Sequence, residues 1–111
     1  GVCAASGVRM TGWLYASGAW YYLDPSGAMR TGWLQMGSHW YLMSDSGAMT
    51  IGWKPLGSTW YYFGASGQMA TGWQQIGGAW YYFGTGGDMY TGGHWIGWRW
   101  YTFGSDGRWL G

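Results

Sequence analysis

Tryptophan and tyrosine carry most of the binding chemistry in this chain, with 12 and 10 copies among 111 residues. One tryptophan follows a glycine at Gly12-Trp13, and this dipeptide recurs every 20 residues as far as Gly72-Trp73. A second opens the Trp-Tyr dipeptides that start at positions 20, 40, 60, 80 and 100. Ring faces that meet at right angles form a cage for quaternary ammonium groups, with about 0.5–2 kcal/mol for each cation–π contact. Rings along a groove would equally suit the apolar faces of sugars.

Groups that could transfer protons or attack a substrate are few. The acidic residues are four aspartates in the segments between strands, where aspartate is an ordinary turn residue: Asp24, Asp45, Asp88 and Asp106. His39 and His94 lie in different repeats without a partner at metal-ligand spacing, so we expect them to pack on strands or lie at the surface. Cys3 is expected to be a small buried apolar residue. The sequence therefore predicts no catalytic site, no metal and no cofactor.

Composition excludes other classes. Charged residues make up 8% of the chain and the net charge is +1. The basic residues are scattered rather than gathered into a patch: Arg9, Arg30, Lys54, Arg99 and Arg108. We therefore expect no nucleic-acid binding, which needs a basic surface. No apolar run approaches the roughly 18 residues of a membrane helix, so no membrane insertion is expected either.

The segments that must position the rings are short strands. Residues 12–16 and 19–23 are rich in apolar residues, and Ser17-Gly18 separates them. Later units have Gly37-Ser38 and Gly57-Ser58 at this place, which suits a two-residue type II′ hairpin. The pattern predicts an all-β fold of about five hairpins, with repeats near 12–31, 32–51, 52–71, 72–91 and 92–111. We interpret residues 1–111 as a single repeat domain cut from a longer array.

A two-residue turn fixes which side chains share a face. Residue 13 then pairs with 22, so Trp13, Trp20 and Tyr22 lie on one face, while Tyr21 and Leu23 lie on the other. A lone hairpin is barely stable in water, and stacking of hairpins along an axis would bury the second face. The predicted architecture is therefore a solenoid of stacked hairpins. Two indoles on the first face of each repeat exceed what such a narrow stack can bury.

The repeated T-G-W, W-Y-Y-F and G-x-M segments resemble the choline-binding, or cell-wall-binding, repeat family. Its members form terminal modules of cell-wall hydrolases and surface proteins of Gram-positive bacteria and their phages. Related glucan-binding repeats of glucansucrases and the repeats of large clostridial toxins share the hairpin solenoid. The resemblance implies a non-catalytic module, secreted or cell-wall-associated, that anchors a parent protein by binding choline on teichoic acids.

The resemblance also implies where the ligand binds. Each cage would combine two tryptophans of one hairpin with a tyrosine of the next: Trp13, Trp20 and Tyr41; Trp33, Trp40 and Tyr61; Trp53, Trp60 and Tyr81; Trp73, Trp80 and Tyr101. Four methionines would form polarizable walls beside the cages: Met29, Met49, Met69 and Met89.

The first tyrosine of each Trp-Tyr-Tyr segment is assigned to the cage rather than the second. It occurs in all five copies, whereas Leu42 and Thr102 replace the second. It also lies on the face opposite its own tryptophans, where it can meet the preceding hairpin. Burial of these first tyrosines would argue against the assignment.

The last repeat departs from the pattern. Gly93 replaces the expected tryptophan, and Trp95 keeps to the same strand face. Trp98 occupies the turn, and Trp109 occupies the methionine position. We expect this repeat to cap the stack or to support a homodimer through terminal repeats.

Two further functions fit the same residues. One is carbohydrate binding, to an α-glucan or a wall polysaccharide, through the rows of aromatic rings. The other is a structural or self-association role without a ligand. Competition by free choline would distinguish choline binding from glucan binding.

Overall fold

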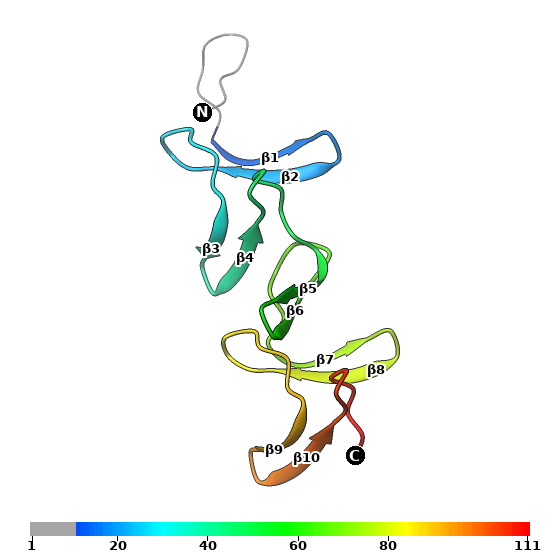
Figure 1. Ribbon diagram of the computed structural model, residues 1–111. Helices are drawn as coiled ribbons and strands as arrows, with labels where there is room; N and C mark the ends of the chain where they lie inside the picture. Colours follow the sequence, from blue (N-terminus) through cyan, green and yellow to red (C-terminus); the bar gives the residue numbers. More distant parts are fainter. Residues whose placement is uncertain (1–10) are drawn as a thin grey trace. The chain divides into compact units, whose positions relative to one another are not determined.

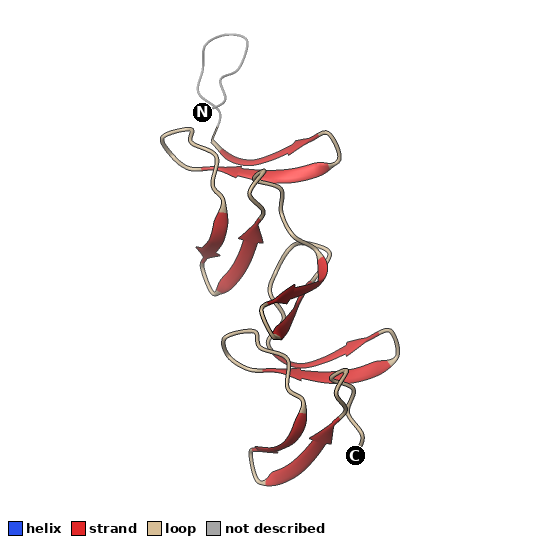
Figure 2. Ribbon diagram, viewed as in Figure 1, coloured by secondary structure: helices blue, strands red, loops and turns tan. Residues whose placement is uncertain are grey.

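The computed structural model describes residues 11–111, so Cys3 and Arg9 lie outside the described part. Within this part the protein is all-β, with no helix (Figure 2). The ten strands follow one another along the chain as five antiparallel pairs (Figure 1). They are β1 (Gly12–Ala16), β2 (Ala19–Leu23), β3 (Gly32–Met36), β4 (His39–Met43), β5 (Gly52–Leu56), β6 (Thr59–Phe63), β7 (Gly72–Ile76), β8 (Ala79–Phe83), β9 (Gly92–Ile96) and β10 (Arg99–Phe103). The predicted hairpin repeat of 20 residues is confirmed.

The predicted register is also confirmed. Trp13 lies opposite Tyr22, and Tyr15 lies opposite Trp20. The turns are of two kinds. Gly37 has a φ of 62° and no positive φ follows it, as in a type II′ turn, whereas Ser17 and Gly18 both have positive φ, as in type I′. Both types match the right-handed twist of the strands, so either keeps the pairing that places the tryptophans on one face.

After each hairpin the chain turns back onto its second strand. Leu23 forms an antiparallel bridge with Met29, and the Arg30 N–H donates to the Tyr22 carbonyl at 2.9 Å. The Asp24 carboxylate accepts hydrogen bonds from the Ser26 N–H at 2.9 Å and the Ala28 N–H at 3.0 Å, which confirms its role as a turn residue. The same bridge recurs after every hairpin: Met43 with Met49, Phe63 with Met69, Phe83 with Met89, and Phe103 with Trp109.

These hydrogen bonds predict an acid-sensitive turn. The pKa of the Asp24 carboxyl is lowered from its ordinary value of 3.8, chiefly by the Ser26 hydroxyl and then by the Ala28 N–H. A depressed folded-state pKa stabilises the fold above the unfolded value, and this stabilisation is lost as the pH falls through the lower folded value. Urea unfolding at about pH 5 and about pH 3 should show a smaller acid loss for Asp24→Asn than for the unmodified protein.

Asp45 provides the matched control, because it lies exposed in the corresponding turn of the next repeat. Asp45→Asn is expected to keep the full acid loss of stability. Equal acid losses in the Asp24 variant and the unmodified protein would contradict the role of the Asp24 hydrogen bonds.

The core is made by the last residue of each hairpin's second strand. These five side chains are at most 2% exposed: Leu23, Met43, Phe63, Phe83 and Phe103. The opposite face of the hairpin, which carries the tryptophans, is partly exposed to solvent: Trp13 and Trp20 are 37% and 43% exposed. The division into a buried second face and a more open first face follows the predicted alternation.

The described residues divide into two compact units. Unit 1 contains residues 11–51 together with Ala65–Gln68, and unit 2 contains Gly52–Gly64 together with Met69–Gly111. In unit 1, Leu34, Tyr41 and Met43 form a buried cluster. In unit 2, Ala70, Tyr81 and Phe83 do so. Successive hairpins therefore share a core within each unit.

Gly67 shows why a glycine recurs at the same position of successive repeats. It is buried with a φ of 86°, and a Cβ at this place would overlap the Met49 side chain. Gly67→Ala should therefore lower the stability of the protein by about 1–3 kcal/mol, through both backbone strain and the displaced methionine. Thermal unfolding measures the loss. Gly12→Ala is the matched control, because Gly12 has a φ of 82° but nothing within 4 Å of the added carbon. An equal loss in both variants would leave no contribution from the Met49 overlap.

Candidate ligand-binding cavities

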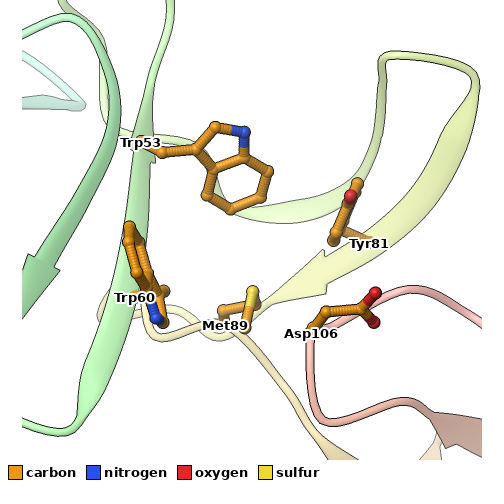
Figure 3. Close-up of a pocket in the computed structure, with 5 residues that line it drawn as sticks. All are labelled: Trp53, Trp60, Tyr81, Met89 and Asp106. Carbon is orange, nitrogen blue, oxygen red and sulfur yellow. The ribbon is translucent and has the colours of Figure 1, made fainter.

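Unit 2 contains a cavity of about 370 Å³ that we call the Asp106 cavity (Figure 3). Its lining comes from three successive repeats. Trp53 and Trp60 belong to β5 and β6, and Tyr81 belongs to β8. Met89 and Asp106 lie on the return segments after β8 and β10. Figure 3 shows Met89 between Trp60 on one side and Asp106 on the other.

The rings of the Asp106 cavity cross at steep angles. The Trp53 and Trp60 ring centroids are 6.4 Å apart, with 79° between the ring planes. The Trp53 and Tyr81 centroids are 5.0 Å apart, with 63° between the planes. Such a corner presents several electron-rich ring faces to one point, which is the geometry that attracts a cation through its quadrupole field.

Unit 1 contains a second cavity of the same design, of about 340 Å³, which we call the Ser66 cavity. Five of its lining residues lie 40 positions before those of the Asp106 cavity: Trp13, Trp20, Tyr41, Met49 and Ser66. Ala65 lines it as well. Trp13 and Trp20 are 6.5 Å apart at 84°, and Trp13 and Tyr41 are 5.2 Å apart at 62°. The cavity is therefore a product of the repeat and not of one local sequence.

Backbone hydrogen bonds hold the methionine walls in place. The Met49 N–H donates to the Trp20 carbonyl at 2.8 Å, and the Met89 N–H donates to the Trp60 carbonyl at 3.0 Å. Each bond joins the return segment of one repeat to the second strand of the preceding hairpin. Since these amide hydrogen bonds join the two backbones, each methionine begins next to the strand that carries the tryptophan.

The fourth predicted cage, formed by Trp73, Trp80 and Tyr101, has a different residue at the methionine position. Trp73 lies 6.4 Å from Trp80 at 79° and 5.0 Å from Tyr101 at 63°, as in the other sets. Trp109 takes the methionine position, with its N–H donating to the Trp80 carbonyl at 2.8 Å. Its ring centroid lies 6.0 Å from that of Trp73. An indole therefore replaces the thioether beside this pair of tryptophans.

In the second predicted set the two tryptophans have the same arrangement. Trp33 and Trp40 lie 6.3 Å apart at 81° in unit 1. Tyr61 belongs to unit 2, so its place in this cage stays a prediction. The remaining predicted walls pack against the glycine of the next repeat, Met29 against Gly47 and Met69 against Gly87.

The tyrosine positions combine an expected and an unexpected feature. Tyr41 and Tyr81 line the cavities formed with the preceding tryptophans, as the assignment of the first tyrosine requires. Both are only 8% exposed, however, and burial of the first tyrosines is the feature that argues against their assignment to the cage. The burial arises because each ring packs onto a tryptophan of the preceding hairpin, Tyr41 onto Trp13 and Tyr81 onto Trp53. Burial is therefore a poor criterion for excluding a ring.

The second tyrosines have a different role. Tyr22 packs against Trp13 at 5.3 Å, and Tyr62 packs against Trp53 at 4.9 Å. Neither lines the cavity beside it. They support the first tryptophan of their own hairpin from the side.

Sequence reasoning missed the loop that closes each cavity. Ala65 and Ser66 lie two repeats after Trp13, and Asp106 lies two repeats after Trp53. The sequence predicted Asp106 only as a turn residue. Its N–H···O bond from Arg108 at 3.1 Å confirms the turn, but the residue also lines a cavity.

The last hairpin differs as its sequence indicated. Trp95 pairs with Trp100, which confirms the shared face, and their ring centroids lie 5.5 Å apart. A Cβ at Gly93 would overlap the Trp100 ring, so this ring occupies the space of the missing tryptophan. Trp98 is fully exposed in the turn.

His94 packs on its strand, as expected. It stacks on Tyr90 at 4.2 Å, and its Nε2 hydrogen-bonds with the Thr91 carbonyl at 2.8 Å. In residues 11–111, no three side chains of the metal-binding types are grouped to hold an ion. The same residues contain no helix that is long and apolar enough to cross a membrane.

Crossed tryptophan pairs on short hairpins recur every 20 residues, from Trp13 and Trp20 to Trp73 and Trp80, and define an aromatic hairpin-repeat module. Residues 50–94 match the choline-binding repeat, and residues 11–29 and 31–49 match the cell wall binding repeat. The chain belongs to the choline-binding repeat family. No curated protein sequence matches it.

Three solved structures from Streptococcus pneumoniae are similar. CbpJ is 47% identical over 95% of this chain and 37% of its own, with a TM-score of 0.89. Choline binding protein F, solved with a peptidoglycan analogue, is 43% identical over 97% of this chain and 37% of its own, with a TM-score of 0.92. The choline binding domain of Spr1274 is 34% identical over 73% of this chain and 95% of its own, with a TM-score of 0.63. The chain thus spans little more than a third of the first two proteins.

Proposed function

We propose that this chain is a non-catalytic wall-binding module whose aromatic cavities bind choline. The observation that carries the proposal is the repeated corner of two crossed indoles, a tyrosine and a methionine in both the Ser66 and the Asp106 cavities. Indole faces are the strongest aromatic partners of a quaternary ammonium group, and a thioether adds a polarizable apolar wall. The names of the similar proteins, two of which are choline-binding, support the same ligand.

The repeat suggests how weak sites would anchor a parent protein. Several sites on one chain raise the affinity for a polymer that displays many copies of the ligand, because the second binding event becomes intramolecular. Choline on teichoic acids is such a polymer-borne ligand. We therefore infer a secreted or cell-wall-associated protein of a Gram-positive bacterium or its phage, held to the envelope by this module.

Carbohydrate binding is the second candidate. One observation favours it, namely that a residue of polar type lines each cavity together with the rings: Ser66 in one and Asp106 in the other. Sugars are bound by an aromatic face together with such hydrogen-bonding groups. An α-glucan or a wall polysaccharide would be the ligand. Self-association through the last hairpin, where Trp95 and Trp98 are exposed, is a further hypothesis that sedimentation velocity would test.

A titration of tryptophan fluorescence separates the two ligands. Choline chloride should give a saturable change, and equal concentrations of NaCl and a soluble α-glucan should not. The change should be weakened at the Ser66 and Asp106 cavities in a Trp20→Ala/Trp60→Ala double variant and kept in full in Trp98→Ala, whose ring is fully exposed and lines neither cavity. A response to glucan alone would move the function to carbohydrate binding, and no response to either would favour the structural role.

A further inference from the structure

The rings of the fourth predicted cage keep the geometry of the Asp106 cavity. Between Trp73 and Trp80 the ring centroids are 6.4 Å apart and the planes cross at 79°, the same values as for the two tryptophans of that cavity. Between Trp73 and Tyr101 the values are 5.0 Å and 63°, again as in that cavity. All three residues lie in unit 2. Two indoles and a tyrosine therefore form the same corner in both places.

Trp109 adds a fourth ring to this corner. Its ring centroid lies 6.0 Å from that of Trp73 at 71°, and 6.1 Å from that of Tyr101 at 56°. Because the planes cross steeply, these rings bound a concave surface instead of forming a parallel stack. The Trp109 N–H donates to the Trp80 carbonyl at 2.8 Å, which is the bond that the methionines of the two cavities make. We call these four rings the Trp109 corner.

The Trp109 corner is open to solvent. Trp80 and Trp109 are 42% and 41% exposed, and Trp60 in the Asp106 cavity is 43% exposed. The indole of Trp109 therefore leaves the second tryptophan of its corner as accessible as its counterpart beside a methionine. A ligand can reach ring surface on both sides of the corner.

The Trp109 corner also draws on fewer repeats. Trp73, Trp80 and Tyr101 lie on β7, β8 and β10, and Trp109 lies on the return segment after β10. These positions belong to two successive repeats, whereas the lining of the Asp106 cavity comes from three. The larger side chain at the methionine position brings a ring to the corner without a contribution from a third repeat.

We propose that the Trp109 corner is a further binding site for quaternary ammonium ligands, in which the Trp109 indole is a binding wall in place of the thioether. This inference rests on the proposed choline-binding function. Indole is the aromatic group that binds cations most strongly, whereas a thioether offers a polarizable apolar surface. The charge of the ligand is therefore recognised by three indoles and one phenol ring.

Two substitutions separate the ring of Trp109 from its bulk. Trp109→Leu keeps an apolar side chain and the backbone N–H but removes one cation–π contact. Choline should then bind about two- to fivefold more weakly at the Trp109 corner. Trp109→Phe keeps a ring face, so its affinity for choline should stay within about twofold of the unmodified protein.

Site-resolved titration with choline chloride tests the proposal, with NaCl as the salt control. The indole N–H signals of Trp60 and Trp80 report the Asp106 cavity and the Trp109 corner in a two-dimensional ¹H–¹⁵N spectrum, and Trp60→Phe and Trp80→Phe variants assign them. We expect a saturable shift at Trp80 whose affinity falls in Trp109→Leu and is largely kept in Trp109→Phe. The affinity at Trp60 should be unchanged in both variants, which also shows that unit 2 stays folded.

A neutral analogue separates recognition of charge from apolar contact. The probe is the alcohol in which a tert-butyl group replaces the trimethylammonium group of choline. Trp109→Leu should weaken binding of choline at Trp80 more than binding of this alcohol. If Trp60 responds to choline but Trp80 does not, or if Trp109→Leu affects both ligands equally, the proposal is wrong and the choline-binding function stands. If choline shifts neither signal, the proposed function itself fails.

Discussion

Replacement of Trp60 by alanine is expected to weaken choline binding in the Asp106 cavity about 5- to 30-fold, equivalent to about 1–2 kcal/mol, while the fold persists. Trp60 is 43% exposed, and its ring meets Trp53 at a steep angle. Its carbonyl, which accepts the Met89 N–H, remains in the variant. The substitution therefore removes one wall of the cage and little of the core. The indole signal of Trp53 provides the measurement, through its shift with added choline.

Trp98→Ala is the matched control for this prediction. Trp98 is fully exposed and lies in the turn between β9 and β10, outside the lining of either cavity. The Trp98→Ala variant should bind choline with unchanged affinity, as measured by the indole signal of Trp53. If Trp60→Ala bound choline as tightly as Trp98→Ala, the second tryptophan would not belong to the binding site.

Replacement of Phe83 by alanine is expected to lower the free energy of unfolding by about 3–5 kcal/mol. Phe83 is 1% exposed, and its ring lies 6.0 Å from Trp53 and 6.4 Å from Tyr81. It therefore supports both rings of the Asp106 cavity from the core side. A hairpin without packed neighbours is barely stable, so we expect unit 2 to lose its structure at lower denaturant concentration. Urea unfolding followed by tryptophan fluorescence measures the loss.

Leu110→Ala distinguishes core packing from a general effect of a smaller side chain. Leu110 lies in the same unit and is 67% exposed. Its replacement should change the free energy of unfolding by no more than about 0.5 kcal/mol. A comparable loss in the two variants would show that Phe83 does not anchor the core.

The sequence predicted the hairpins and their faces because these depend on local rules. The two-residue turn at Ser17-Gly18 fixes the pairing of Trp13 with Tyr22, and strand alternation then places Trp20 beside them. The assignment of Tyr41 required one more step, the contact of each hairpin with the next. The resemblance to choline-binding repeats supplied that step, and Tyr41 does line the Ser66 cavity.

The closing loop could not be predicted in the same way. Whether Asp106 reaches Trp53 depends on the rotation between successive hairpins, which no residue of a single repeat determines. Turn composition indicated only that Asp106 is a turn residue, and its hydrogen bond to Arg108 confirms that role. The burial of Tyr81 likewise depends on how closely Trp53 of the preceding hairpin approaches it. Such features belong to the stacking of repeats rather than to the repeat itself.

The span of each cavity over three repeats has a consequence for synthesis on the ribosome. The tryptophans of the Asp106 cavity leave the exit tunnel first, Tyr81 and Met89 follow, and Asp106 comes last. A newly made cage therefore has its full walls only after two further repeats have emerged. Assembly of the sites is vectorial, and each site matures behind the growing end of the chain. Nascent chains stalled after Met89 should thus present the aromatic corner without the loop that carries Asp106.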